Sequence, residues 1–231
     1  MKKNNLSMVA SEIKGLYCWL AQYGIADVGN PPRQVVRNGI QYIGFANDDK
    51  ISGALHANQS YDKIFDFLKS SNAFSFKLLD GALLQLSYAF NHERIVKHRL
   101  AYYSCPKLPE YQEDLDLYDE EHLYDESLRR NTVPVPMRFD FDKNMCLPDT
   151  HPFSHLTLGQ YKGCRIPVSA PLTPLQFVRF ILMCFYRNLW EAYKNTYPVN
   201  DLRFEESIRG CEMSEVYVQV GNTSNCRNEQ K

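Results

Sequence analysis

The sequence lacks the short motifs that identify several large enzyme classes. It contains no HExxH, no GxxxxGK[ST], no GxGxxG and no GxSxG. These motifs form the zinc site of metalloproteases, the phosphate loop of NTPases, the dinucleotide-binding loop and the serine elbow of hydrolases. Their absence removes the sequence support for all four classes.

Long apolar runs are also missing. The longest run, from Phe180 to Tyr186, is far shorter than the roughly twenty residues that a membrane-spanning helix requires. Near the N-terminus, Ser11, Glu12 and Lys14 interrupt the apolar residues, so a signal-peptide core is absent. We therefore expect a protein without a membrane anchor.

The seven cysteines form no CxxC pair, and their odd number leaves one unpaired in any disulfide scheme. Disulfides are typical of oxidising compartments. We therefore expect a protein of a reducing cytoplasm, and the sequence indicates no cofactor.

Positive charge is missing from one segment. Residues 110–126 hold nine carboxylates and no Lys or Arg, whereas the net charge of the whole chain is only −1. The rest of the chain is therefore moderately basic, at +8. We expect an acidic loop that is either a solvated insertion or a cover that competes with a polyanion for the basic body.

The sequence does contain the pattern of an antiparallel α+β fold. Asn38-Gly39 and Asp80-Gly81 lie between segments rich in β-forming residues, and each pair predicts a hairpin. Residues 94–103 continue the alternation of apolar and polar side chains, which predicts a further strand of a meander. In that strand His98 falls on the apolar face, which favours a hydrogen-bonded core histidine over a ligand.

Helical spacing of apolar residues predicts a first helix from about Leu6 to Tyr23 and a short helix from Tyr61 to Leu68. A third helix, from Thr173 to Asn195, begins with a capping threonine followed by proline. We predict a curved antiparallel sheet of about six strands, packed against an N-terminal helix and a long, largely buried C-terminal helix. Residues 1–220 would form a single domain, and residues 221–231 a disordered tail.

Charged residues alternate with apolar ones in two predicted strands, and they define the candidate site. Arg138, Asp140 and Asp142 share one face of the first strand, and His155 and Thr157 share one face of the second. In the following hairpin we expect Gln160 to pair with Cys164. That register sets Arg165 opposite Gly159, and Ser169 opposite His155, on the same outward face. The predicted catalytic residues are His155, Arg138, Asp140 and Arg165, and the predicted binding residues are His151, Asp142, Thr157, Lys97 and Arg99.

A metal site is the first interpretation of these residue types, which include His151, His155 and Asp149. In an extended strand, however, two histidines four residues apart would be separated by roughly 13 Å, too far to share one ion. Only a turn through Pro152 and Phe153 would bring them together. We therefore predict no metal ligands, and a metal-dependent nuclease stays a secondary alternative.

Two metal-free interpretations remain open. One is an endoribonuclease in which His155 moves protons while Arg138 and Arg165 stabilise the charge on phosphorus. The other, which we favour, is a binding or effector component that holds a nucleic acid, a nucleotide or a protein partner through arginine contacts. The sequence does not indicate the oligomeric state.

The run HPFSHLTLG, followed by CRIPVSAPLTP and a Phe-rich helix, resembles the uncharacterised bacterial family DUF2290. The resemblance extends from about Ala73 to Tyr197. It implies no established activity and no catalytic residues. It does suggest that the gene lies near mobile elements and phage-defence genes. We therefore expect a component of a phage-defence or toxin–antitoxin type system with an operon-encoded partner.

Overall fold

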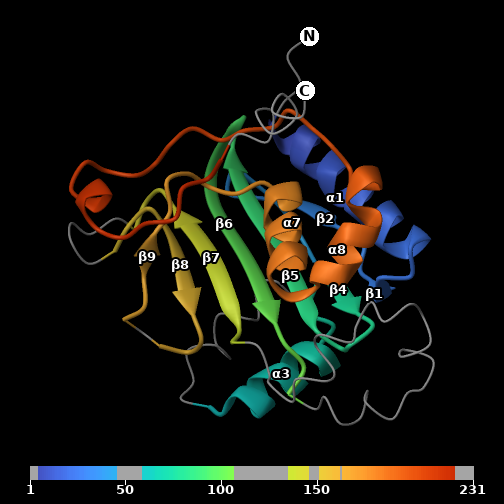
Figure 1. The fold of residues 1–231 in the computed structure, drawn as a ribbon. Coiled ribbons are helices and arrows are strands. Elements are labelled where there is room, and N and C mark those ends of the chain that lie inside the picture. Colours follow the sequence, from blue (N-terminus) through green and yellow to red (C-terminus); the bar gives the residue numbers. More distant parts are fainter. Residues whose placement is uncertain (1–4, 46–58, 107–134, 146–150, 162, 222–231) are drawn as a thin grey trace, which may run out of the picture.

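The chain folds as an α+β protein around one large antiparallel sheet that does not close into a barrel (Figure 1). The computed structural model describes residues 5–45, 59–106, 135–145, 151–161 and 163–221. Within these ranges the sheet has nine strands instead of the predicted six or so, and the predicted fold class is confirmed. The predictions for residues 110–126 and 222–231 fall outside the described ranges.

The strands follow the predicted alternation of side chains. They are β1 (Ala26–Gly29), β2 (Arg33–Arg37), β3 (Ile40–Gly44), β4 (Phe76–Leu78), β5 (Leu83–Asn91), β6 (Arg94–Tyr103), β7 (Met137–Asp142), β8 (Ser154–Leu158) and β9 (Ile166–Pro167). Strands β5 to β9 form a meander in which each strand pairs antiparallel with the next. Strands β4 and β3 pair with different parts of the free edge of β5, and β2 pairs with β3.

Both hairpins predicted from turn dipeptides are present. At the β2–β3 turn, Asn38 and Gly39 have φ angles of 50° and 77°. Positive φ at both central residues is what a tight two-residue hairpin turn requires. At the β4–β5 turn, Gly81 has a φ of 83°. Local chemistry therefore determines where the chain reverses at these two places.

The helices are α1 (Asn5–Gln22), α3 (Tyr61–Ser70), α7 (Pro174–Phe185) and α8 (Arg187–Tyr193), followed by 3-10 turns at Lys194–Thr196 and Glu212–Ser214. Thr173 caps α7 as predicted, because its hydroxyl accepts from the Gln176 backbone N–H while the Gln176 side chain accepts from the Thr173 N–H.

The prediction of one long C-terminal helix is wrong, because the chain leaves helical geometry at Tyr186, where φ is −131° and ψ is 53°. The Tyr186 hydroxyl is buried and donates a hydrogen bond of 2.7 Å to Asp80. This contact anchors the break between α7 and α8 to the β4–β5 turn. Helix α7 is largely buried, as predicted, and Met183 near its end is 38% exposed.

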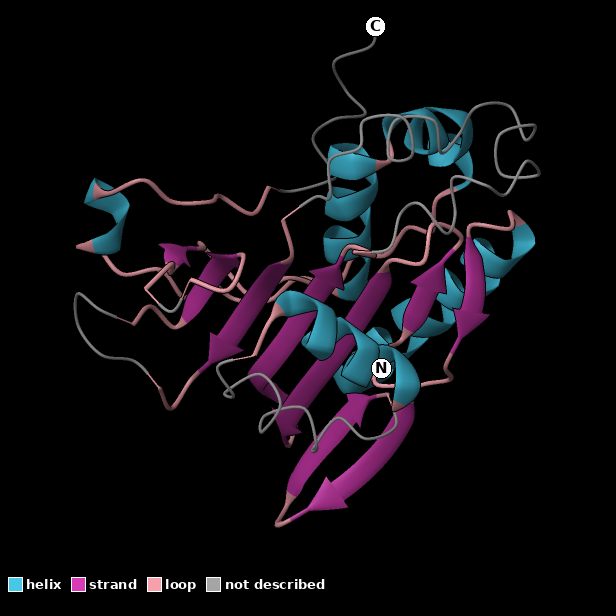
Figure 2. Cartoon of the chain, turned by 90° about the horizontal axis from the view of Figure 1, so that it is seen from below, coloured by secondary structure: helices cyan, strands magenta, loops and turns pink. Residues whose placement is uncertain are grey.

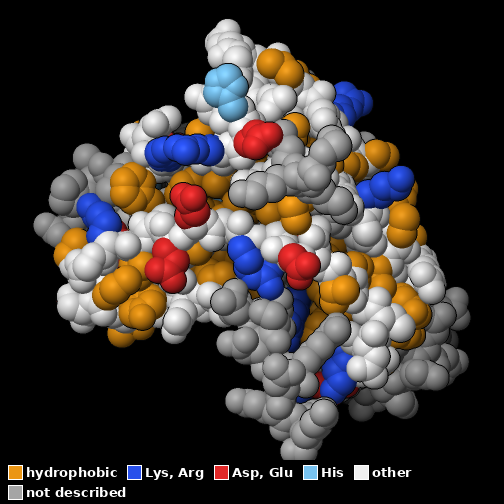
Figure 3. Space-filling model, turned by 90° about the horizontal axis from the view of Figure 1, so that it is seen from above, with side chains coloured by type: hydrophobic (Ala, Val, Ile, Leu, Met, Phe, Trp, Pro, Cys, Tyr) orange, Lys and Arg blue, Asp and Glu red, His pale blue; other side chains and the backbone are white. Residues whose placement is uncertain are grey.

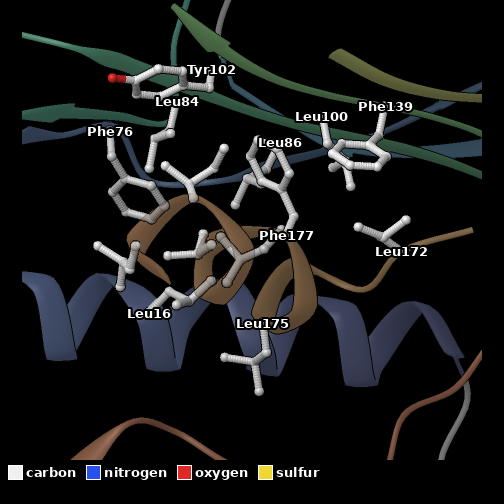
Figure 4. Close-up of a cluster of buried hydrophobic side chains, with 14 of the residues drawn as sticks. Leu16, Phe76, Leu84, Leu86, Leu100, Tyr102, Phe139, Leu172, Leu175 and Phe177 are labelled. Atoms are coloured by element: carbon white, nitrogen blue, oxygen red, sulfur yellow. The ribbon is translucent and has the colours of Figure 1, made fainter. Parts of the chain in front are cut away.

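The main core lies between one face of the sheet and helices α1, α7 and α8. Figure 4 shows α7 between the sheet and α1, with Phe177 surrounded by Leu86, Leu100 and Phe139 of the strands. The Phe139 and Phe177 rings meet edge to face, with centroids 6.1 Å apart. This layer contains the larger share of the buried apolar side chains and leaves the opposite sheet face for other contacts.

A second, smaller core covers one end of that opposite face. Helix α3 packs there through Ile64, Phe65 and Leu68 against Leu83 and Tyr103 of the sheet. In Figure 2, seen from below, α3 lies in front of the strands. The candidate site therefore occupies a face of which one end is covered by a helix. Among the described residues, no helix is both long and apolar enough to cross a membrane.

Candidate functional site

Strand register brings most of the predicted site residues together on one sheet face. Across β6 and β7, Arg99 pairs directly with Asp140. Across β7 and β8, Asp140 pairs with His155. Direct partners in an antiparallel sheet project from the same face. The neighbouring pairs, Lys97 with Asp142 and Arg138 with Thr157, flank this row on the same face.

Asp140 is the centre of the cluster because two arginines contact it. The Arg99 Nε atom donates to Asp140 Oδ1 at 3.2 Å, and the Arg138 Nε atom donates to Oδ2. Tyr103 adds a side-chain hydrogen bond to Arg138. Each carboxylate oxygen thus has its own guanidinium partner, which fixes the positions of both arginines.

The charge balance around Asp140 favours its ionised form. Burial alone would raise the pKa of this carboxyl, but Arg138 and Arg99 outweigh burial and lower it below its ordinary value. The cluster of Arg99, Arg138 and Asp140 therefore carries a net charge of one positive unit at neutral pH. Such an excess attracts anions.

The prediction that these residues look out into solvent is wrong for Asp140, His155, Thr157 and Ser169. The side chain of Asp140 is only 13% exposed and that of His155 only 5%. The arginines are more open, with side-chain exposures of 26% for Arg99 and 29% for Arg138. A buried acid and a buried imidazole thus lie beneath two partly exposed guanidinium groups, which differs from an ordinary solvated sheet face.

His155 is held between two hydrogen-bond acceptors. Its Nδ1 atom lies 3.3 Å from the Pro152 carbonyl oxygen, and its Nε2 atom lies 3.8 Å from Asp140 Oδ2. Burial nevertheless lowers the pKa of His155 to about 4, against the opposing effect of Asp140. The imidazole is therefore neutral at pH 7, and its nitrogens face protein groups.

His151 lies next to His155, contrary to the prediction that the two histidines are far apart. Their ring centroids are 4.9 Å apart because the chain bends at Phe153, and the Pro152 carbonyl oxygen also lies 3.2 Å from His151 Nδ1. Among the described residues, no group of three or more His, Cys, Asp or Glu side chains is placed to hold a metal ion. Asp149, the third candidate ligand, lies outside those ranges.

Arg165 lies outside the paired residues of β8 and β9. The expected register, with Ser169 opposite His155, is wrong by two residues, since His155 pairs with Pro167. The turn is longer than predicted, because Gly159 has a φ of 62° and the Leu158 N–H donates to the Cys164 sulfur instead of to a backbone carbonyl. Arg165 is exposed and precedes β9, outside the paired strands.

The remaining predicted residues have plainer surroundings. Lys97 Nζ lies 3.1 Å from Asp142 Oδ2, and the lysine side chain is 56% exposed, so this pair is a surface ion pair of little energetic weight. Thr157 is buried beside Arg138. His98 is a core histidine, as predicted, and its Nε2 atom accepts from the Leu172 N–H at 3.2 Å. Burial lowers the pKa of His98 to about 4.

Some contributors to this face could not be found by sequence reasoning. Tyr103 lies at the end of β6, where the sequence is mostly apolar. It belongs to the site because its hydroxyl accepts a hydrogen bond from the Arg138 side chain. A hollow of about 450 Å³ lies at the β5–β6 turn, where Asn91, His92, Arg94 and Lys143 are among its lining residues. None of the Asp140 cluster lines it, so we do not assign the site to this hollow.

Comparison with known proteins identifies one family. The profile of DUF2290, described as an uncharacterized conserved protein, matches residues 28–220, which is well over half of the chain. Searches of the curated proteins and of the solved structures found no match. The matched range includes every residue of the Asp140 cluster, whereas α1 precedes it.

Proposed function

The chain belongs to the DUF2290 family of uncharacterised conserved proteins, and we propose that it is a binding component that recognises a phosphate-bearing ligand, a nucleic acid or a nucleotide. The observation that carries this proposal is that Arg99 and Arg138 share the single carboxylate of Asp140. Asp140 positions both guanidinium groups but neutralises only one of them.

The contacts with Asp140 leave donors for a ligand. Each guanidinium has five N–H groups, and the bond to Asp140 uses the Nε–H of each arginine. A guanidinium fork binds two phosphate oxygens at once, which a lysine ammonium cannot do. Two partly exposed forks held by one buried acid therefore form a preorganised anion site.

His155 supports binding better than catalysis. A general acid or base must reach the proton that it transfers, whereas the His155 ring is buried and its nitrogens face Pro152 and Asp140. We therefore assign His155 a supporting role beneath Asp140.

The proposed setting is the bacterial cytoplasm, in a phage-defence or toxin–antitoxin type system with an operon-encoded partner. The five cysteines that the structure describes form no disulfide, and cysteines without disulfides are typical of a reducing compartment. Co-purification of the chain with the products of neighbouring genes tests the partnership.

Fluorescence anisotropy with a labelled single-stranded RNA and with labelled ATP tests the binding proposal. We expect binding of at least one probe, with an affinity that Arg138→Ala reduces about tenfold, the typical effect of one charge-assisted hydrogen bond. Arg138→Lys, which keeps the charge without the fork, should lose most of the same affinity. Lys14→Ala on α1 removes an exposed positive charge from the other layer and serves as the matched control.

Three outcomes contradict the proposal or replace it. Failure of both probes to bind the wild-type protein contradicts it, as does an equal loss of affinity in Arg138→Ala and Lys14→Ala. RNA cleavage that persists in EDTA and disappears in His155→Ala would show that the protein is a metal-independent ribonuclease instead. Thermal melts of each variant show whether the protein is folded in the assay.

A further inference from the structure

The Asp140 cluster is one end of a longer row of side chains that crosses the sheet. Val35 of β2 pairs with Tyr42 of β3, and Tyr42 pairs with Ala89 of β5. Ala89 in turn pairs with Lys97 of β6, which pairs with Asp142. Because direct partners share a face, the β2–β3 hairpin presents Tyr42 on the same face as the candidate site.

The basic side chains of this face extend as far as the outermost strand. Arg33 and Arg37 alternate with Val35 on β2, so they project from the same face as Tyr42, and every residue of β2 is exposed. On β2, β3, β5, β6, β7 and β8, this face carries six basic and two acidic side chains: Arg33, Arg37, Arg94, Lys97, Arg99 and Arg138 against Asp140 and Asp142. The row therefore has a positive excess along its length.

Two neighbouring parts of the surface have a more even balance of charge than the row. Seen from above, Lys and Arg side chains alternate with Asp and Glu side chains among hydrophobic ones, and neither sign dominates that view (Figure 3). Helix α3, on the same side of the sheet as the row, exposes two lysines and two aspartates, which cancel. The row is thus more uniformly basic than α3, which lies on the same side of the sheet.

Small residues separate the two basic regions. Ser87 and Ala89 of β5 lie between Tyr42 on one side and Arg99 and Lys97 on the other. Tyr42 is 37% exposed, and two strand spacings of roughly 4.8 Å set its strand about 10 Å from that of Lys97. An exposed aromatic ring beside a basic row is the arrangement that binds unpaired bases and their phosphates together.

We propose that the ligand of this face is a single-stranded nucleic acid that crosses the sheet from the Asp140 cluster to the β2–β3 hairpin. This proposal rests on the phosphate-binding role proposed above and extends it from one anion site to a track. Arg99 and Arg138 bind phosphate at one end, Tyr42 stacks on a base, and Arg33 binds a further phosphate at the hairpin. A duplex offers Tyr42 no unpaired base, and a mononucleotide cannot reach both ends.

Anisotropy titrations with labelled 20-nucleotide single strands of RNA and DNA, the matching duplexes and labelled ATP test the track. We expect the single strands to bind most tightly, with Tyr42→Ala weakening them about tenfold, the effect typical of one stacked base. Arg33→Ala should reduce the slope of log affinity against log salt by about 0.7, the value for one phosphate contact on a single strand. The RNA and DNA arms decide which sugar the track prefers.

Controls on α1 match both substitutions. Tyr17 is 38% exposed, almost as much as Tyr42, so Tyr17→Ala removes a comparable ring from the other layer. Lys14→Ala removes one positive charge there, as Arg33→Ala does on the hairpin. Neither control should change single-strand affinity by more than about twofold, the scatter of neutral surface changes.

The failures of the two proposals differ. If ATP binds as tightly as the single strands, and if Arg33→Ala and Tyr42→Ala change nothing while Arg138→Ala still weakens binding, the track is wrong and the anion site stands. Equal affinity for duplex and single strand also overturns the track. If none of the probes binds, both proposals fall.

Discussion

Arg99 and Asp140 face each other as direct partners across β6 and β7, and the Nε atom of Arg99 lies 3.2 Å from Oδ1 of Asp140. Arg138, two residues before Asp140 on the same strand, takes the other carboxylate oxygen. The sheet register thus places one acid between two arginines that are 41 and 2 residues away in the chain. We therefore expect Asp140 to stabilise the fold and, at the same time, to lower the affinity for an anion.

Replacing Asp140 by Asn should destabilise the fold strongly. The substitution leaves two like charges beside each other in a poorly solvated place, and removal of one partner from a buried ion pair typically costs about 3–5 kcal/mol. Chemical denaturation of the variant measures this loss. Affinity for a phosphate ligand should rise in the fraction that remains folded, because the carboxylate no longer neutralises the arginines.

Asp142→Asn is the matched control on the same strand. Its partner Lys97 is 56% exposed, and a surface ion pair contributes at most about 1 kcal/mol. If the two substitutions destabilise the protein equally, the Asp140 cluster is not buried in the way that we describe.

His155 should lose its proton far below the usual pH for histidine. Burial lowers its pKa to about 4, below the unfolded value of about 6.5. The neutral ring therefore adds stability that is complete above pH 6.5 and is lost as the pH falls through 4, up to about 3 kcal/mol. Nuclear magnetic resonance titration of the imidazole measures the pKa, and a value at or above 6.5 would show that Asp140 outweighs burial.

Much of this fold could be predicted because its signals are local. From Met137 to Asp142, apolar and polar side chains alternate, which predicts both the strand and the face of each residue. Asn38-Gly39 predicts a tight turn that few other dipeptides adopt. Thr173 and Pro174 mark the start of α7 in the same way. At each of these positions, neighbours in the sequence supply the physical cause.

One prediction failed where a distant contact decides the geometry, and two failed where the chain turns within a few residues. The break at Tyr186 depends on Asp80, which is 106 residues away, and an apolar helical pattern does not reveal it. The β8–β9 register depends on the Cys164 sulfur, which replaces a backbone partner of Leu158. The closeness of His155 to His151 follows from the bend at Phe153, whereas a strand pattern alone predicts a straight segment.

Glu12 gives stability the opposite pH dependence to that of His155. This carboxyl lies in α1 and accepts from the Leu175 N–H at 3.1 Å, beside a cavity of about 70 Å³. Burial raises its pKa to about 7, above the unfolded value of about 4.3. Its contribution is therefore complete below pH 4.3 and is lost as the pH rises through 7.

Glu12→Gln should remove that loss, because an uncharged amide can still accept from Leu175. Relative to the variant, the wild-type protein should lose about 3 kcal/mol of unfolding free energy between pH 4.5 and pH 8. Denaturation curves of both proteins across this range supply the comparison. A constant difference between them at all pH values would mean that Glu12 titrates normally.

The most direct measurement of the central claim follows the side chains of Arg99 and Arg138 themselves. In a sample with ¹⁵N-labelled arginine, the Nε–H signals of these two residues are assigned from Arg99→Lys and Arg138→Lys and are followed as a single-stranded RNA decamer is added. Our account predicts that both signals shift and saturate together, while the signal of Arg187, paired with Glu191 on α8, stays in place. If RNA binds to saturation and the Arg99 and Arg138 signals do not move, the ligand binds elsewhere and the account is wrong.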